Sequence, residues 1–159
     1  MLYKLTIGAG ENIFIFAEIR YIIVPSGKFW RRVPPKGGRM IIGIGADIIE
    51  IERVAKACAD EKFRDKIFTV AEREMLVKKP PESAAGNFCC KEAAVKALGR
   101  GFASVAPIDV EALRDGSGAP VIFFHGAARE YAEALGVKKI HASVTHCKDY
   151  AAAFVVLEG

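Results

Sequence analysis

The stretch MIIGIGADIIEIERV, residues 40–54, decides the fold, because it places two glycines and a carboxylate between an apolar run and a helix-like pattern. The apolar run predicts a buried strand over 41–45, and apolar residues at helical spacing predict a helix over 48–58. Asp47 stands between the two elements. Since Asp is a common N-cap, a helix cap is the favoured role for this residue alone. The functional alternative is a magnesium ligand at a phosphate site.

A second carboxylate lies in CKEAAVKALGRG, residues 90–101, which reads as the end of a long helix. Glu92 and Lys96 are four residues apart, so their side chains share one face of this helix. By spacing alone, a surface ion pair is the commoner explanation. The alanines around them, however, let another surface approach closely. Asp47, Glu92 and Lys96 together therefore indicate magnesium-assisted chemistry on a phosphate ester.

The rest of the chain mixes helices with strands joined by hairpins, without βαβ alternation. Thr69 followed by Glu72 predicts a capping box, and Gly99 predicts the end of the long helix. Further elements are expected as helices over 69–78, 83–98 and 126–135 and as strands over 107–113, 119–124, 137–146 and 150–158. This order predicts an α+β fold with a small antiparallel or mixed sheet packed against helices, one of them long.

The composition favours a single domain and does not indicate a protein that binds nucleic acid or spans a membrane. The 159 residues are 52% hydrophobic and carry a net charge of +4. Residues 1–39 hold seven basic and two acidic side chains, which leaves residues 40–159 at −1. The apolar stretch 13–24 contains Glu18 and Arg20, so it is too short and too charged to span a bilayer. We expect neither nucleic-acid binding nor membrane insertion, because the basic charge belongs to the leading segment alone.

Cysteine and histidine usage predicts a reducing compartment and no zinc. The four cysteines form no CxxC pair, so a cytoplasmic location is the simplest expectation. Cys147 follows His146, but no second ligand pair has suitable spacing for zinc. Cys89 and Cys90 lie among apolar residues and are expected to fill the core. A lone histidine such as His146, at the end of a strand, is more often structural than catalytic.

Residues 33–39, VPPKGGR, break the pattern just ahead of Met40. Lys36, Gly37 and Gly38 can be encoded by a purine-rich sequence of the kind that binds ribosomes. We therefore predict that translation naturally starts at Met40 and that residues 1–39 are upstream sequence. The alternative is a genuine N-terminal extension that forms a short hairpin.

Five segments in this order resemble the holo-acyl-carrier-protein synthase family, the small bacterial phosphopantetheinyl transferases. They are GIGADIIEIERV, FTVAERE, CKEAAVKALGRG, IDVEALRDGSGAPVI and SVTHCKDYAAAFVV. The resemblance covers residues 40–159, and its most specific part is the aspartate followed by KEAxxKA. It implies the phosphopantetheinyl transferase fold for that domain.

The resemblance also implies an activity: transfer of the 4′-phosphopantetheine arm of coenzyme A to a serine of apo acyl carrier protein in fatty acid biosynthesis, releasing adenosine 3′,5′-bisphosphate. Asp47 and Glu92 would hold Mg²⁺, and Lys96 would neutralise charge on the diphosphate. Glu92 and a metal-bound water are both candidates to take the serine proton. Lys91, Thr145 and His146 match positions that line the coenzyme A site.

The same resemblance implies partners and a shared site. Arg53 matches a carrier-protein contact, and Arg53 with Lys56 belongs to a segment, 53–66, of net charge +2 that suits an acidic carrier. An ordinary solvated helix is the alternative. Family members are usually homotrimers with the site between subunits, so a trimer is expected.

The chain departs from the family pattern at two positions that bear on the contacts to the adenosine 3′-phosphate. Asn87 stands where many relatives have a basic residue, and Ala119 stands where a lysine is frequent. The competing functional class is a non-catalytic module of the same fold that binds a nucleotide or a carrier protein.

Overall fold

The computed structural model describes residues 2–7, 11–16, 19–23, 30–33 and 40–159. The chain divides into two compact units, Met1–Met40 and Ile41–Gly159. The first contains an antiparallel sheet in the order β1-β2-β3-β4, with strands Leu2–Ile7, Glu11–Phe16, Ile19–Ile23 and Trp30–Val33. Among its described residues this unit is therefore larger than the hairpin that the sequence offered as an alternative.

The predicted translation start at Met40 depends on a segment that includes residues 36–38, which lie outside the described residues. It stays a prediction.

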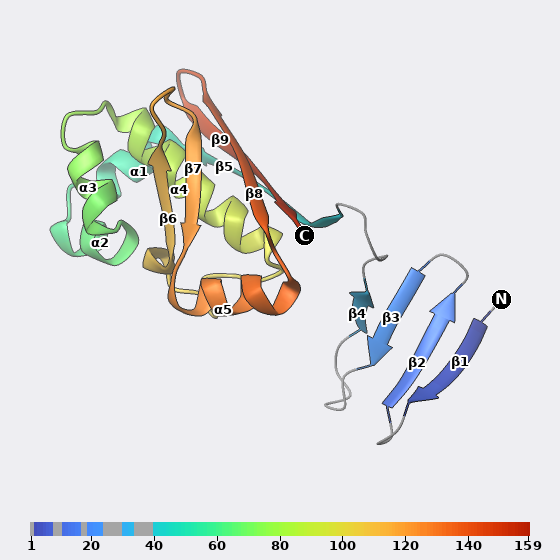
Figure 1. Ribbon diagram of the computed structural model, residues 1–159. Coiled ribbons are helices and arrows are strands. Elements are labelled where there is room, and N and C mark those ends of the chain that lie inside the picture. Colours follow the sequence, from blue (N-terminus) through green and yellow to red (C-terminus); the bar gives the residue numbers. More distant parts are fainter. Residues whose placement is uncertain (1, 8–10, 17–18, 24–29, 34–39) are drawn as a thin grey trace. The chain divides into compact units, whose positions relative to one another are not determined.

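The second unit is built on a three-stranded antiparallel sheet and one long helix (Figure 1). The strand order is β5-β9-β8, with β5 at Ile41–Glu50, β9 at Tyr150–Glu158 and β8 at Lys139–His146. Helix α4, Pro81–Ala97, packs against this sheet. A separate hairpin of β6, Val110–Arg114, and β7, Pro120–Phe124, lies beside it. The expected α+β class with one long helix is confirmed.

Shorter helices complete the second unit, and their ends follow the sequence signals. They are α1 at Ile51–Ala57, α2 at Glu61–Ile67, α3 at Val70–Leu76, α5 at Gly126–Leu135 and the 3-10 turn η1 at Pro107–Asp109. The capping box of Thr69 and Glu72 is present at the start of α3. Gly99, with φ +68°, follows α4, and Gly136, with φ +77°, closes α5. These positive φ angles explain why glycine ends both helices.

The boundary near Asp47 differs from the prediction. Strand β5 continues to Glu50, and helix α1 begins only at Ile51, so Asp47 is a strand residue opposite Ala153 and not a helix cap. The predicted helix start at Ile48 is wrong because β9 offers hydrogen-bond partners along the whole of β5. Because side chains alternate between the two faces of a strand, Asp47 lies on the face of the sheet that packs against α4, whereas Ile48 lies on the exposed face.

Two glycines set the distance between β5 and α4. A Cβ at Gly45 would lie 1.9 Å from the carbonyl oxygen of Ala93, and one at Gly43 would lie 1.9 Å from that of Ala97. The strand backbone therefore packs directly on the helix backbone, a contact that needs glycine on one side and alanine on the other. The core around this contact also contains Cys89 and Cys90, both fully buried, which confirms them as core residues.

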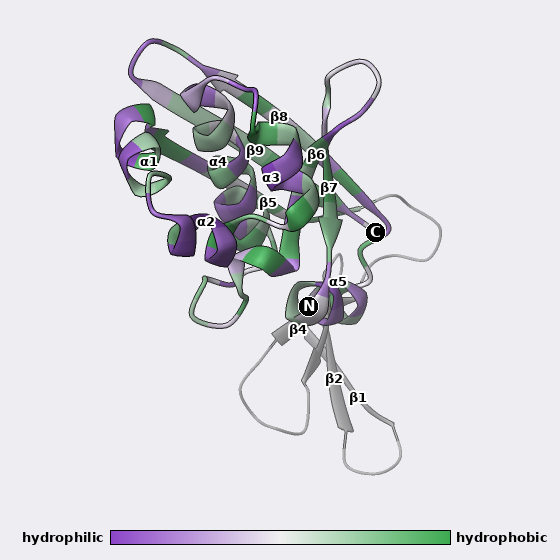
Figure 2. Ribbon diagram, turned by 90° about the vertical axis from the view of Figure 1, so that its left-hand side faces the viewer, coloured by the Kyte–Doolittle hydropathy of each residue, from purple (hydrophilic) through white to green (hydrophobic). Residues whose placement is uncertain are grey.

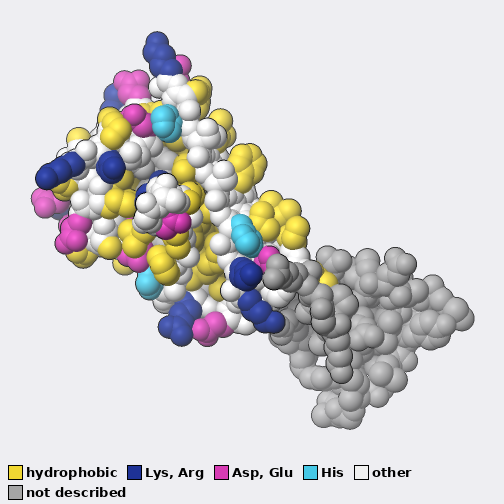
Figure 3. All heavy atoms as spheres, turned by 45° about the horizontal axis from the view of Figure 1, so that its top comes forward, with side chains coloured by type: hydrophobic (Ala, Val, Ile, Leu, Met, Phe, Trp, Pro, Cys, Tyr) yellow, Lys and Arg dark blue, Asp and Glu magenta, His cyan; other side chains and the backbone are white. Residues whose placement is uncertain are grey.

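Helix α2 is largely hydrophilic, whereas α1 mixes hydrophilic and hydrophobic residues, as the purple and green in Figure 2 show. Among the described residues, none of the helices combines the length and the apolar character needed to cross a bilayer. In the view of Figure 3, basic and acidic side chains of the second unit are interspersed, so this face has no field of a single sign.

Candidate functional site

Asp47 and Lys96 meet where β5 crosses α4. The ammonium nitrogen of Lys96 donates a hydrogen bond to Asp47 Oδ1 at 2.8 Å and another to the carbonyl oxygen of Ala46 at 3.2 Å. The Asp47 side chain is 14% exposed and that of Lys96 is 48% exposed, so the pair lies at the surface of the unit. The convergence of these residues, which the sequence left open, is therefore present in the structure.

Glu92 completes the cluster one helical turn before Lys96. Burial raises the pKa of its carboxyl group, the nearby Asp47 charge raises that pKa further, and Lys96 opposes both effects. The carboxylates of Asp47 and Glu92 thus lie close enough to interact. Lys96 forms its ion pair with Asp47, so the surface Glu92–Lys96 pair suggested by spacing alone is not the arrangement observed.

The hydrogen bond to Asp47 also affects the lysine. It is the largest cause of a raised pKa for Lys96, which therefore keeps its positive charge at neutral pH. A permanent cation beside two carboxylates suits a site that handles phosphate groups.

The donor set fits one hard cation. Among the described residues no group of three or more His, Cys, Asp or Glu side chains gathers in a metal-binding cluster. Two carboxylates are nevertheless the usual protein share of a magnesium site that is completed by water and substrate phosphate. Cys89 is not a competing ligand, because burial and the Asp47 charge raise the pKa of its thiol to about 12.

Lys91 lies in the core and not beside Asp47. Its side chain is fully buried, and its nitrogen lies 2.6 Å from Oε2 of the equally buried Glu72. It also donates to the carbonyl oxygens of Pro107 and Val110. The Lys91 side chain thus exposes no surface in this chain, and its expected contact with coenzyme A stays a prediction.

Thr145 and His146 lie on the terminal strand pair, away from Asp47. Thr145 pairs with Ala152, which pairs with Ile48, so these three side chains occupy the exposed face of the sheet. Asp47 is on the opposite face. His146 is exposed at the end of β8. A single chain therefore does not bring Thr145 to the Asp47 cluster.

Arg53 and Lys56 are exposed on α1, where Lys56 forms an ion pair with Glu52 at 2.7 Å. The segment that the sequence treated as one solvated helix is two helices, because Asp60 caps a second helix by accepting a hydrogen bond from the Lys62 amide. The basic residues of the segment therefore project from two helix axes.

A pocket of about 580 Å³ lies at Asn87, one of the two positions at which this chain departs from the family pattern. It is lined by Met75, Leu76, Lys79, Ser83, Asn87 and the turn 114–118 that precedes Ala119. Asn87 is fully buried, and its amide group donates to the carbonyl oxygen of Ala112 at 2.7 Å. The charged side chains that line this pocket are Lys79, Arg114 and Asp115, and the sequence did not single them out.

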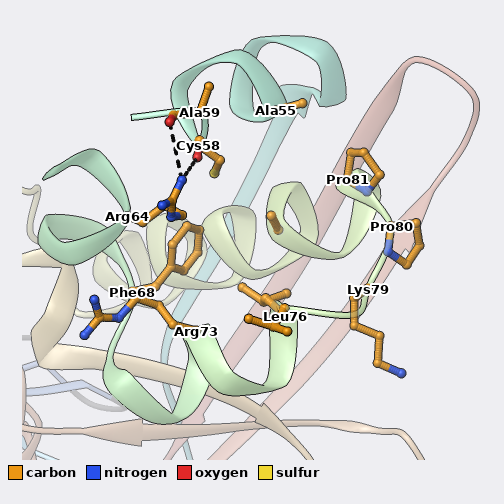
Figure 4. A pocket seen from close by; sticks show the side chains of 12 residues that line it. Ala55, Cys58, Ala59, Arg64, Phe68, Arg73, Leu76, Lys79, Pro80 and Pro81 are labelled. Carbon is orange, nitrogen blue, oxygen red and sulfur yellow. Dashed lines mark hydrogen bonds between the residues drawn. The ribbon is translucent and has the colours of Figure 1, made fainter. Parts of the chain in front are cut away.

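A second pocket, about 480 Å³, was also missed by sequence reasoning (Figure 4). It lies among α1, α2, α3 and the start of α4, with Phe68 and Leu76 on its walls. Arg64 is tied to the carbonyl oxygens of Cys58 and Ala59, as the dashed lines show. Residues from four helices form this pocket, so no local pattern predicts it.

Comparison with known proteins identifies the family. Residues 43–155 match the family model of the 4'-phosphopantetheinyl transferase superfamily. The holo-[acyl-carrier-protein] synthase of Lachnoclostridium phytofermentans is 44% identical over 119 residues, which are 75% of this chain and 97% of the relative. That of Maridesulfovibrio salexigens is 47% identical over 123 residues, 75% and 99% of the two chains.

Solved structures agree as well. The Bacillus anthracis holo-(acyl-carrier-protein) synthase in complex with CoA (3',5'-ADP) has a TM-score of 0.64 and 35% identity, covering 76% of this chain and 98% of that one. The Helicobacter pylori enzyme in complex with coenzyme A has a TM-score of 0.63 and 30% identity, covering 72% and 98%.

The family match and the shared fold define the class of protein: the chain belongs to the 4'-phosphopantetheinyl transferase superfamily. Within that superfamily its relatives are holo-[acyl-carrier-protein] synthases, and the enzyme class expected from the sequence is confirmed.

Proposed function

We propose that this chain transfers the 4′-phosphopantetheine arm of coenzyme A to a serine of apo acyl carrier protein and releases adenosine 3′,5′-bisphosphate. The observation that carries the proposal is the contact of Lys96 with Asp47, 2.8 Å long, beside Glu92. It gathers two carboxylates and a cation from separate elements, which is the set that a diphosphate substrate requires.

Asp47 and Glu92 would hold one Mg²⁺, as the family resemblance implies. When bound, the ion neutralises charge on the diphosphate oxygens. Lys96 supplies a second positive charge from the protein, held in place by its bonds to Asp47 and Ala46.

The serine oxygen of the carrier forms a bond to the phosphorus next to the pantetheine arm, and the bond from that phosphorus to the bridging oxygen breaks. Lys96 would stabilise the negative charge that develops on the leaving phosphate. The serine proton would be accepted by Glu92 or by a water held at the metal site, the two candidates for the general base.

The pocket lined by Lys79 and Arg114 is our candidate for the adenosine 3′-phosphate end of coenzyme A. It lies at Asn87 and beside Ala119, where the family contacts were in question. The two cations replace the positive charge that Asn87 and Ala119 do not supply.

A homotrimer would complete the site with Thr145 and His146 of a neighbouring subunit. Support comes from the exposed face of the β5-β9-β8 sheet, where Ile44, Ile48 and Phe154 are 63%, 67% and 55% exposed. An apolar sheet face of this kind is typical of an interface between copies. Because Thr145 shares that face, association would carry it into an interface.

Arg53 and Lys56 on α1 are proposed to contact the carrier, whose acidic surface suits their charge. We place the reaction in fatty acid biosynthesis in the cytoplasm. The four cysteines, all free, are consistent with a reducing compartment.

The test is formation of adenosine 3′,5′-bisphosphate from coenzyme A, followed by chromatography with and without apo carrier and Mg²⁺. We expect product only when both are present. The competing proposal, a non-catalytic module of the same fold, predicts binding of coenzyme A or the carrier without any product.

A further inference from the structure

A buried polar network holds the side of α4 that is turned away from β5. At its centre, Lys91 Nζ lies 2.6 Å from Glu72 Oε2, and both side chains are fully buried. The same nitrogen donates to the carbonyl oxygens of Pro107, at 3.1 Å, and Val110. An ammonium group has three N–H donors, so each has an acceptor.

Glu72 carries the network into two further elements. Its carboxylate accepts hydrogen bonds from the amide of Thr69 at 2.9 Å and from the amide of Ala112 at 3.0 Å. Asn87, one turn before Lys91, donates to the carbonyl oxygen of Ala112 at 2.7 Å. Helix α4 is thereby tied to the start of α3 and to the backbone of β6.

The opposite side of α4 is fixed by Ala93 and Ala97 against the β5 glycines. Lys91 and Ala93 are separated by roughly 200° around the helix, so α4 is held from two sides. Glu92 follows Lys91 directly. A side-chain tip lies about 5–6 Å from the helix axis, so a rotation of about 10° would move the Glu92 carboxylate by about 1 Å.

A displacement of that size matters for catalysis, because a misplacement of about 1 Å can cost about 100-fold in rate. Stability alone does not require the ion pair, since a buried ion pair can often be replaced by apolar residues without loss. Removal of only one partner would leave the other as an uncompensated buried charge, so the two residues have to be replaced together.

We propose that Glu72 and Lys91 are positioning residues, which fix the rotation of α4 so that Glu92 and Lys96 face Asp47. The effect on turnover rests on the proposed transferase function. The claim that the pair fixes the rotation of α4 does not rest on that function, because it concerns only whether Lys96 contacts Asp47.

The test is the double variant E72L/K91M, which removes both charges and keeps apolar volume. We expect an unchanged circular dichroism spectrum, a kcat lowered about tenfold or more and a higher half-saturating Mg²⁺ concentration, with the KM for coenzyme A unchanged. The matched control is R129M/E133Q, which removes the exposed pair on α5 and should leave all three values as in the wild type. Wild-type kcat and Mg²⁺ dependence in E72L/K91M would overturn the proposal.

Two further measurements apply if the double variant does not fold or if the wild-type protein shows no transfer. If E72L/K91M does not fold, E72Q/K91M, which removes both charges but keeps a side-chain oxygen that can accept a backbone hydrogen bond, should still lower kcat several-fold with the KM for coenzyme A unchanged, and an unchanged kcat would overturn the proposal. If the wild-type protein transfers nothing, the proposed function fails, and a crystal structure of E72L/K91M decides the geometric claim alone. Separation of Lys96 from Asp47 beyond about 4 Å supports positioning, whereas an intact contact contradicts it.

Discussion

Lys96 Nζ lies 2.8 Å from Asp47 Oδ1, although the two residues are 49 positions apart in the sequence. The contact joins the end of α4 to β5. The local sequence pattern favours a helix-cap role for Asp47. The contact instead places Asp47 in a cluster with Lys96 and a second carboxylate, Glu92. The chemistry proposed for this chain depends on that cluster.

Replacing either carboxylate should abolish turnover and leave the fold intact. Asp47 and Glu92 are both partly exposed, so Asp47→Ala and Glu92→Ala create no large cavity in the core. We expect no detectable carrier modification, with circular dichroism spectra like that of the wild type. Glu133→Ala, at an exposed position on α5, is the control and should be fully active. Full activity in either site variant would refute the metal assignment.

The Glu92 carboxyl group should titrate above its ordinary pKa of 4.5 in the metal-free protein. Burial is the main cause and the Asp47 charge the second, so Asp47→Asn should bring the pKa down without restoring the ordinary value. Carboxyl-resolved NMR across pH 3–8 measures both values. A Glu92 pKa at or below 4.5 in the wild type would show that the site is more solvated than described.

The same shift has a consequence for stability. A carboxyl group whose pKa is higher in the folded state binds protons more tightly there, so its ionisation reduces the free energy of unfolding as pH rises through that window. Glu92→Gln should therefore stabilise the protein more at pH 7 than at pH 4, while removing activity. Thermal melts at the two pH values test this, and an equal or opposite difference would contradict it.

Gly45→Ala should be strongly destabilising. The new Cβ would lie 1.9 Å from the Ala93 carbonyl oxygen, which belongs to helix backbone and cannot move without shifting α4. We expect a loss of about 1–3 kcal/mol in the free energy of unfolding, together with reduced activity, because Asp47 moves relative to Lys96. Gly101→Ala, where the added Cβ meets nothing within 4 Å, is the control. Comparable stability of the two variants in urea would rule out the close approach.

Phe154→Glu should dissociate the proposed trimer. Phe154 is 55% exposed on the face of the sheet that carries Ile48 and Thr145, and a charge there opposes burial between subunits. Phe123→Glu, 46% exposed on the separate β6-β7 hairpin, is the matched control. Light scattering should give a monomer mass for the first variant and the wild-type mass for the second. A wild-type protein that is already monomeric would contradict the proposed assembly.

Local signals predicted much of the fold, because they act over a few residues. The capping box at Thr69 and the glycine ends of α4 and α5 are such signals, and all three are present. The end of β5 was not predictable in this way. Apolar spacing after Asp47 fits a helix, but pairing with β9, about 100 residues away, extends the strand to Glu50.

The sequence likewise predicted some residues of the site and missed others. Residue types and order identified Asp47, Glu92 and Lys96, and the structure brings these three together. The family resemblance implied that Lys91 lines the coenzyme A site; in this chain its side chain is buried on the other side of α4, where it pairs with Glu72. Glu72 and Lys91 lie on different helices, so no short-range sequence pattern links them. The sequence therefore did not predict this buried pair.

The most direct test of the central claim is the intact mass of apo acyl carrier protein after incubation with this protein, coenzyme A and Mg²⁺. We expect an added phosphopantetheine mass that is absent after chelation of Mg²⁺, with the Lys96→Met variant, and on a carrier whose acceptor serine is replaced by alanine. An unmodified carrier, under conditions in which an established transferase modifies it fully, would contradict the account.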